Sequence, residues 1–373
     1  MKILKEFYHH FRNKYNNILW NKTSSEFLGG LQLHKMEAYP FKDKIIKIKD
    51  PKILKSFKQF SQFKQKEYIV KISKKAFVEP KYGWVISEFN YLLTDSLPYA
   101  TKLEIPSFNN YIKTRFLANK KIRKEKIIIS LRDISEASYF HFYNDVLNKL
   151  ILLENFNISK NIPLLISKKL FEKHFFQGAL KRSNLKDRKW IIQDNFYIET
   201  DEIIYCKTMP HRKSYFDKLL NLLNVPEPNN TSIKRIFLTR NPNIGRCIKN
   251  YDQIKKVCNK FGFEIKDTEN ISLDEQIKLF SNARYIIGIH GAGLTNIIFR
   301  RNGKLSLLEI FPPDNIPPHY YWLASIFGFN YDAILGSNVP KDNLNKNLSK
   351  KPFYLDPKFL IDKLGSLEKE KFF

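Results

Sequence analysis

The chain has 373 residues, 43% of them hydrophobic and 27% charged, a composition that excludes an intrinsically disordered protein and is enough for two domains of ordinary size. Its three cysteines are scattered and form no CxxC pair, which excludes a disulfide framework and a cysteine-rich zinc site and indicates a reducing compartment. No apolar run approaches the roughly 18 residues of a membrane span, and no secretory signal is recognisable, so we expect a cytoplasmic location.

The first 20 residues predict a basic amphipathic helix. Apolar side chains recur at helical spacing among lysines and arginines, at Leu4, Phe7, Phe11, Tyr15 and Ile18. Such a helix either lies peripherally on an anionic membrane surface or packs on its own domain. The interpretation of the formal net charge of +27 is also open. The charge either serves to attract nucleic acid, anionic lipid or phosphorylated substrates, or reflects lysine-rich codon usage.

Up to residue 120 the pattern is irregular, with one strand expected at 82–86. From residue 126 strands alternate with helices, which predicts a parallel sheet. A helix is expected at 138–156. The strands of this part are expected at 127–130, 163–167, 185–193 and 202–208. A stretch rich in Pro, Asn and Ser at 225–232 predicts a linker that ends a first domain of residues 1–225.

The second half predicts a Rossmann-like βαβ domain at residues 232–340. Its strands are expected at 235–240, 263–266, 285–289, 305–310 and 330–335, and its helices at 251–261, 273–283 and 320–327. Ser272 followed by Glu275 predicts a capping box at one helix start, and Gly328 ends the last helix. The tail of residues 341–373 is expected to form one or two helices that cross back to the first domain.

A glycine turn joins the strand at 285–289 to the next helix, expected at 294–299. His290 is at the carboxyl end of the strand, where open α/β sheets place ligand-binding groups, and it can donate hydrogen bonds or carry a charge. Gly291 and Gly293 permit a tight turn, and unpaired amides at a helix start favour a phosphate or diphosphate. The alternative is a turn that only connects strand to helix.

With these elements placed, the second half resembles the family 61 glycosyltransferases, a group that includes bacterial capsular polysaccharide enzymes. The similarity rests on ordered motifs: a helix with a histidine at 139–154, a strand followed by arginines at 237–250, the central block at 272–299 and a strand with a glutamate at 307–312. Phe142 and the Gly245–Arg246 pair depart from the pattern of many relatives. These departures leave the acceptor details open.

The resemblance implies an α/β protein with GT-B architecture, in which two Rossmann-like domains face a cleft. The nucleotide-sugar donor is then bound by the C-terminal domain, the acceptor by the N-terminal domain, and the sugar is transferred with inversion and without an essential metal or cofactor. The absence of an Asp-x-Asp pair agrees with metal independence. The expected donor-binding residues are Arg240, Arg246, Asn250, His290, Gly291, Ala292, Gly293, Leu294, Thr295, Asn296 and Glu309.

Individual roles within that set differ. Glu309 is expected either to bind the ribose hydroxyls or to be a solvated strand end. Thr295 and Asn296 either add hydrogen bonds to the donor or cap the helix. Arg240 and His290 are the expected ligands of the leaving diphosphate, whose developing negative charge needs fixed donors.

Asp145 is the expected catalytic base, with His141 orienting it, because residues four apart share one helical face. The roles can be reversed, and the alternative is a surface ion pair.

The expected partners are a nucleotide-sugar and a glycan or lipid-linked glycan, in capsule, lipopolysaccharide or other surface polysaccharide synthesis. Two rival classes remain. One is a basic nucleic-acid-binding protein, although no nucleic-acid-binding motif is present. The other is a nucleotide-binding scaffold of this fold without transferase activity.

Overall fold

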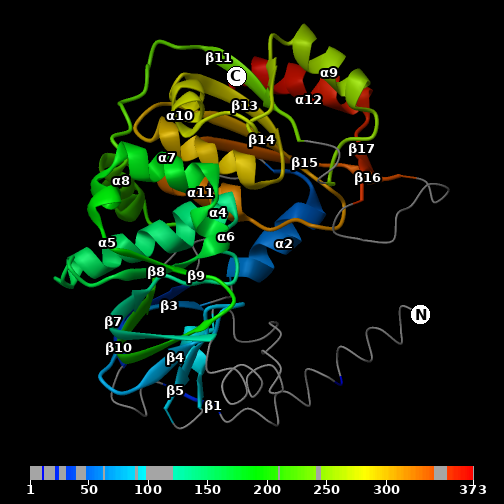
Figure 1. Ribbon diagram of the computed structural model, residues 1–373. Helices are drawn as coiled ribbons and strands as arrows, with labels where there is room; N and C mark the ends of the chain where they lie inside the picture. The colour runs from blue at the N-terminus through cyan, green and yellow to red at the C-terminus, as the bar shows by residue number, and fades with distance from the viewer. Residues whose placement is uncertain are drawn as a thin grey trace. The chain divides into compact units, whose positions relative to one another are not determined.

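The described part of the computed structural model divides into two compact units (Figure 1). Unit 1 comprises Met1–Met36 and Lys66–Pro210, and unit 2 comprises Glu37–Gln65 and His211–Phe373. The described residues are 11, 22–24, 31–38, 48–61, 64–88, 91–97, 121–208, 211–240, 245–339 and 351–372. The amphipathic helix predicted for residues 1–20 therefore lies outside the described residues, apart from the exposed Phe11.

Unit 1 is built on a sheet whose long central strand, β10 (Tyr197–Lys207), pairs in parallel with β7 (Ile122–Ser130). Beyond β7 lie β8 (Leu164–Ser167) and β9 (Trp190–Gln193), also parallel, so the predicted parallel sheet is confirmed here. The other edge of β10 pairs antiparallel with β3 and β4. The remaining strands are β1 (Lys22–Thr23), β2 (Leu31–Ala38), β3 (Lys64–Ile72), β4 (Ala76–Val78), β5 (Val85–Ser87) and β6 (Leu92–Leu93).

The helix predicted for 138–156 is present but interrupted. It consists of α4 (Tyr139–His141), a π-helical segment η5 (Phe142–Leu147) and α5 (Asn148–Asn155). A π-helical turn inside an α-helix is uncommon and is found frequently at functional sites, since it redirects side chains that regular spacing would place elsewhere. The other helices of unit 1 are η3 (Thr94–Ser96), α6 (Lys168–Phe171), α7 (His174–Arg182) and η6 (Asn184–Asp187).

Unit 2 contains a fully parallel five-stranded sheet in the order β12-β11-β13-β14-β15. All five strands were predicted, and the structure places them at β11 (Lys234–Leu238), β12 (Glu264–Lys266), β13 (Ala283–Ile289), β14 (Ser306–Phe311) and β15 (Asn330–Leu335). Alternate residues face opposite sides of a strand. Leu308 and Ile310 therefore enter the hydrophobic core on one face, while Glu309 between them faces the other.

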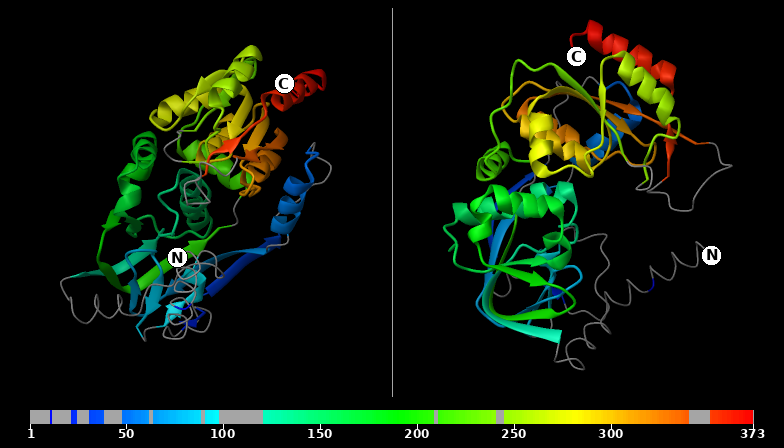
Figure 2. Two further views of the ribbon diagram at one scale, coloured as in Figure 1. Left: turned by 90° about the vertical axis from the view of Figure 1, so that its right-hand side faces the viewer. Right: turned by 45° about the horizontal axis from the view of Figure 1, so that its top comes forward.

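Helices cover this sheet on both faces. On one face α9 (Tyr251–Lys260) lies beside α12 (Pro357–Lys369), as Figures 1 and 2 show. The capping box predicted at Ser272 is present at the start of α10 (Leu273–Ser281). Gly328, with φ of 70°, ends α11 (His319–Phe327) as predicted. The other elements of unit 2 are α8 (Lys213–Leu222), η8 (Ala292–Arg300), β16 (Ser337–Asn338) and β17 (Phe353–Tyr354).

Two segments of unit 2 were not anticipated in their observed places. The tail was expected to cross back to the first domain, whereas Leu360, Leu364 and Leu367 of α12 are buried in the unit 2 core. The second segment is α2 (Pro51–Ser61), which comes from the part of the chain without a clear pattern. Its Phe57 packs on Tyr321, with ring centroids 5.2 Å apart, and its Ser56 hydroxyl donates to the carbonyl of Ile316 at 2.7 Å.

The strand order of unit 2 has a switch point between β11 and β13. From β11 the chain moves to one side to form β12 and then returns past β11 to form β13. Connections that leave two neighbouring parallel strands in opposite directions open a crevice at their carboxyl ends, and doubly wound sheets bind ligands there. Arg240 follows the end of β11 and His290 follows the end of β13.

Candidate functional site

Arg240 and His290 converge at the carboxyl ends of β11 and β13. The Arg240 Nη1 atom donates to the His290 carbonyl at 3.4 Å, and its Nε donates to the Gly245 carbonyl at 2.8 Å. Two backbone carbonyls therefore orient the guanidinium group. The two residues predicted to bind the same anion are thus neighbours.

Two positive charges, those of Arg240 and Arg246, act on each other at these strand ends. Burial lowers the pKa of Arg240, and the charge of Arg246 lowers it further. Burial also lowers the pKa of Arg246. Among the described residues, no carboxylate forms an ion pair with either arginine. Two half-buried cations that repel each other are stabilised by an anion placed between them.

Gly291 is required by space rather than by backbone conformation. Its φ of 168° is extended and open to any residue. A Cβ atom built at Gly291 would lie 2.1 Å from Arg240 Nη1, so any side chain here displaces the guanidinium group. Gly288, three residues earlier in β13, is also tightly packed, because a Cβ there would lie 2.4 Å from Leu294 Cδ2.

Gly291→Ala is expected to impair binding of a nucleoside diphosphate about tenfold or more while leaving the fold intact, because the displaced atom ends a flexible side chain. Calorimetric titration with UDP and thermal unfolding measure the two effects separately. Gly365→Ala is the matched control, since no atom lies within 4 Å of a Cβ built there and alanine favours helix α12. Equal nucleotide affinity in both variants would contradict the role of Arg240.

His290 is held by a chain of buried hydrogen bonds. Its Nδ1 lies 2.5 Å from Glu309 Oε1, and the Tyr331 hydroxyl donates to Glu309 Oε2 at 2.5 Å. Burial, reinforced by Arg246 and Arg240, lowers the pKa of His290 to about 3. Burial raises the pKa of Glu309 well above its ordinary value, although the Tyr331 hydrogen bond opposes this.

Both pKa shifts favour the uncharged forms of His290 and Glu309. A protonated Glu309 donates from Oε1 to His290 Nδ1 and accepts from Tyr331 at Oε2. The neutral imidazole then carries its own proton on Nε2, and this N–H is the group it offers to an anion. Glu309 is fully buried and its two oxygens contact His290 and Tyr331, so it is not a solvated strand end, and it lies where it orients His290. Its contact with the ribose hydroxyls stays a prediction.

Four other residues predicted to bind the donor have structural contacts. The Asn250 amide donates to the Leu355 carbonyl at 2.8 Å and ties the start of α9 to the C-terminal segment. Asn296 is buried and donates to Gln276 Oε1 at 2.9 Å, which joins η8 to α10. The side chains of Leu294 and Thr295 are also buried. Sequence motifs alone did not distinguish residues that support the turn from residues that line it.

The turn itself is tighter than predicted. The segment expected to begin an α-helix at Leu294 is the 3₁₀-helix η8, which starts at Ala292, and the Leu294 amide already donates to the Gly291 carbonyl at 3.0 Å. Ala292 and Gly293 are half-buried and are the members of the turn nearest the surface. Any unpaired amides that bind a phosphate, as predicted for this turn, are therefore limited to its first residues.

In unit 1, His141 and Asp145 form the predicted pair on one helical face. His141 Nδ1 lies 2.5 Å from Asp145 Oδ2, and the Asn144 amide donates to Asp145 Oδ1 at 2.9 Å. Burial alone would lower the pKa of His141, but the hydrogen bond and charge of Asp145 outweigh it and raise the pKa. Burial would likewise raise the pKa of Asp145, but His141, Lys149 and Lys207 lower it.

Lys149 and Lys207 were missed in the sequence. Lys149 is buried, its Nζ donates to the Arg132 carbonyl at 3.1 Å, and it lies 3.6 Å from Asp133 Oδ2. Burial lowers the pKa of Lys207, at the end of β10, to about 8. Lys149 follows Asp145 by four residues, a spacing that could have indicated it. Nothing in the sequence brings Lys207 to this helix. We call Asp133, His141, Asp145, Lys149 and Lys207 the unit 1 charge cluster.

The described residues contain neither a metal-binding cluster nor a membrane-spanning helix. No three His, Cys, Asp or Glu side chains in these stretches gather closely enough to hold a metal ion. No helix within the same stretches has the length and apolarity that crossing a bilayer requires.

Comparison with known proteins gives one family. No curated protein matches the sequence. The model of the family described as Glycosyltransferase 61 matches residues 139–307, a range that includes the His141–Asp145 pair and the Arg240–His290 crevice. This match shows that residues 139–307 are similar to glycosyltransferase family 61 and supports a family 61 glycosyltransferase.

Proposed function

We propose that this protein is an inverting glycosyltransferase of GT-B architecture that transfers a sugar from a nucleotide-sugar to a glycan of a surface polysaccharide. Unit 2 binds the donor and unit 1 binds the acceptor. The observation that carries the proposal is a pair of arginines, Arg240 and Arg246, beside His290 at the switch point of the unit 2 sheet. Neither arginine forms an ion pair with a carboxylate of the described residues. A nucleoside diphosphate has the charge and size that such a crevice binds.

The chemistry assigned to unit 2 is stabilisation of the leaving group. As the bond between the anomeric carbon and the diphosphate oxygen breaks, its electron pair moves to the diphosphate. Arg240 and Arg246 neutralise that charge, and the His290 Nε2–H donates to it without titrating, because the pKa of His290 is lowered to about 3. These fixed cations act in place of a divalent metal ion.

The chemistry assigned to unit 1 is activation of the acceptor. An acceptor hydroxyl attacks the anomeric carbon from the face opposite the diphosphate and loses its proton to Asp145. The pKa of Asp145 is lowered by His141 and by the two lysines of the unit 1 charge cluster, so the carboxylate is ionised and able to accept this proton. His141 orients the carboxylate through its 2.5 Å contact.

Glu309→Gln is expected to retain transfer within about threefold, because an amide N–H donates to His290 Nδ1 as the protonated carboxyl group does, and the amide oxygen accepts from Tyr331. Glu309→Leu is expected to lose at least about tenfold, since it leaves two buried polar groups unpaired. Steady-state kinetics of the two variants, with ¹⁵N spectra of the His290 ring, make the comparison. Similar large losses in both would mean that the carboxyl group is ionised.

The binding half of the proposal is tested by thermal unfolding with UDP-, GDP-, CMP- and dTDP-sugars at fixed salt, with and without EDTA. A donor at 100 times its Kd raises the stability by about 2.7 kcal/mol and therefore raises Tm. We expect one nucleotide class to do so equally with and without EDTA, and Arg240→Gln to abolish the shift. No shift with any donor would overturn the proposal, and a shift seen only without EDTA would overturn its metal independence.

Binding alone does not separate a transferase from a scaffold of the same fold. The donor that shifts Tm is therefore incubated with the protein, and release of the nucleoside diphosphate is measured. We expect slow hydrolysis in water that Asp145→Asn reduces, because the same base activates water. Binding without release, with or without candidate glycans, would favour the scaffold.

A further inference from the structure

Unit 1 contains a cavity of about 540 Å³ that the donor site and the catalytic pair do not use. It lies at the carboxyl ends of β7, β8 and β9, because its walls are formed by the residues that follow each of these strands. They are residues 132–138 after β7, 167–169 after β8 and 193–195 at the end of β9, together with Pro80, Lys81 and Lys173. A cavity of this volume accepts a ligand of one or two sugar rings.

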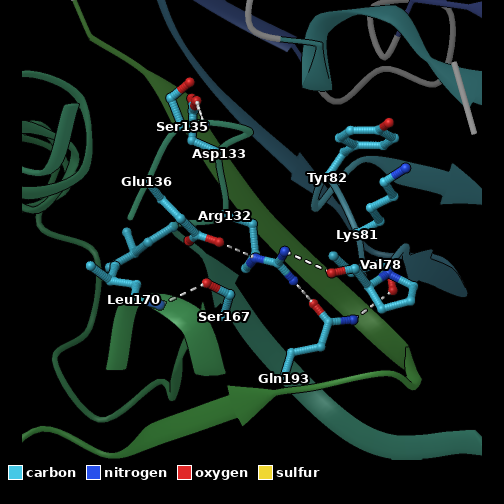
Figure 3. A network of polar contacts seen from close by, with 12 residues as sticks. Val78, Lys81, Tyr82, Arg132, Asp133, Ser135, Glu136, Ser167, Leu170 and Gln193 are labelled. Carbon is cyan, nitrogen blue, oxygen red and sulfur yellow. Dashed lines mark hydrogen bonds and ion pairs between the residues drawn. The ribbon is translucent and has the colours of Figure 1, made fainter. Parts of the chain in front are cut away.

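The floor of the cavity is rigid. Arg132, whose side chain is 1% exposed, donates from Nε to Glu136 Oε1 at 2.7 Å and from Nη2 to the Pro80 carbonyl at 2.9 Å, and its Nη1 contacts Gln193 Oε1 (Figure 3). Gln193 in turn donates to the Val78 carbonyl at 2.9 Å. Each of the three guanidinium nitrogens of Arg132 thus has a protein partner. These contacts hold Arg132 in place at the floor of the cavity.

The inner wall favours a ligand with hydroxyl groups. Glu136 is buried, with Oε1 held by Arg132 and Oε2 without accessible surface, so it shapes the wall and does not bind the ligand. Ser135, Ser138 and Asn195 contribute short side chains that both donate and accept. Sugar hydroxyls have the matching chemistry.

The outer wall favours a negative charge. Four lysines line the cavity: Lys81, Lys168, Lys169 and Lys173. Two of its three carboxylates are engaged by cations other than these four lysines, since Glu136 pairs with Arg132 and Asp133 lies 3.6 Å from Lys149. The third, Asp194, pairs with Lys168 at 3.2 Å. The positive charge of Lys169 and Lys173 has no such counterpart in the described residues.

From these two walls we propose that the unit 1 cavity binds an acidic glycan, one or two sugar residues that carry a carboxylate or a phosphate. The acidic group lies against Lys169 and Lys173, and the sugar hydroxyls lie against Ser135, Ser138 and Asn195. Asp133 belongs both to this cavity and to the unit 1 charge cluster, so a glycan held here extends toward Asp145. The assignment rests on the proposed function in one respect, namely that the bound glycan is the acceptor.

The test is calorimetric titration of the full chain with three sugars at fixed ionic strength: glucuronic acid, glucose 6-phosphate and glucose. At least one acidic sugar is expected to bind about tenfold or more tightly than glucose, and raising the salt concentration is expected to weaken that preference. The two acidic sugars together distinguish a carboxylate from a phosphate. Equal affinity for all three would overturn the proposal.

Variants locate the binding. Lys169→Ala with Lys173→Ala is expected to abolish the preference for the acidic sugar without lowering the affinity for glucose. Lys181→Ala with Lys186→Ala removes the same charge from exposed positions that do not line the cavity, and it is expected to change nothing. Ala137→Phe, which fills the cavity, is expected to weaken all binding. A preference that survives the first double variant, or is lost equally in the control, contradicts the assignment.

The same titrations are repeated with UDP present and with Arg240→Gln. If the acidic sugar binds the cavity but no nucleotide binds unit 2, the cavity assignment stands and the transferase proposal fails. If a nucleotide binds and no acidic sugar does, the cavity assignment fails and the transferase proposal stands.

Discussion

Replacing Arg240 with glutamine is expected to lower kcat/KM for glycosyl transfer by a factor of about 10² to 10³. The loss follows from the position of the guanidinium group, which two carbonyls, those of Gly245 and His290, hold at the carboxyl end of β11. A donor fixed before the reaction is more effective than one that must reorganise as the charge develops. Steady-state kinetics with the donor identified by thermal unfolding measure the effect.

The stability of the same variant should move little, or rise. Arg240 is half-buried beside Arg246, and both burial and the neighbouring charge lower its pKa, which means that the charged form is disfavoured in the folded protein. Glutamine removes that repulsion. A variant that loses function without losing stability is typical of a residue selected for its site rather than for the fold.

Arg235→Gln is the matched control at the other end of the same strand. Arg235 pairs with Glu368 at 2.7 Å and donates to the Phe261 carbonyl at 3.0 Å, so its loss is expected to reduce stability by about 1 kcal/mol and leave kcat/KM unchanged. Urea unfolding of both variants supplies the comparison. If Arg240→Gln unfolds the protein as readily as Arg235→Gln does, its kinetic loss says nothing about catalysis.

The fold of unit 2 could be predicted from the sequence because its signals are local. A parallel sheet covered on both faces needs uninterrupted apolar strands, and residues 286–289 and 305–310 supply them. Helix ends were equally predictable, because the Ser272 capping box starts α10 and Gly328 ends α11 through contacts within a single helical turn. Even α2 had a usable signal, because Asp50 accepts from the amides of Lys52 and Ile53 at the helix start.

Unit 1 was less predictable because its sheet depends on contacts between distant residues. Strands as short as β4, β5 and β6 carry too few residues for a periodic pattern. Their antiparallel pairing, β4 with β10, β5 with β4 and β6 with β5, forms only as the chain folds. The Arg132–Gln193 contact joins residues 61 apart. Likewise, nothing near Lys207 in the sequence indicates that burial lowers its pKa to about 8.

The candidate donor site shows which kind of inference fails. The sequence predicted correctly that Arg240 and His290 come together, because strand ends in a parallel sheet share one edge. It did not predict that Glu309 is buried behind His290, because the face on which a strand residue lies depends on what packs there. The contacts of Glu309 with His290 and Tyr331 are therefore a property of the packed sheet.

Asp145→Asn is expected to lower kcat by a factor of about 10² to 10⁴, the usual contribution of a general base. Asparagine keeps the size and the hydrogen bond from Asn144 but cannot accept a proton. Glu154→Gln is the matched control in α5, because Glu154 is exposed, pairs only with Lys160 at 3.0 Å among the described residues, and lies outside the unit 1 charge cluster. An unchanged kcat in Asp145→Asn would remove Asp145 from the mechanism.

The pH dependence of kcat then decides between Asp145 and His141 as the base. The pKa of Asp145 is lowered from 3.8, so this carboxylate is ionised above about pH 4 and a rate that depends on it stays level from pH 5 to 7. The pKa of His141 is raised from 6.5, so a rate that requires the neutral imidazole falls about tenfold per pH unit once the pH is below this raised pKa. We expect the level profile. An acidic limb near neutral pH that moves to lower pH in Asp145→Asn, where the imidazolium has lost its partner, would instead identify His141 as the base.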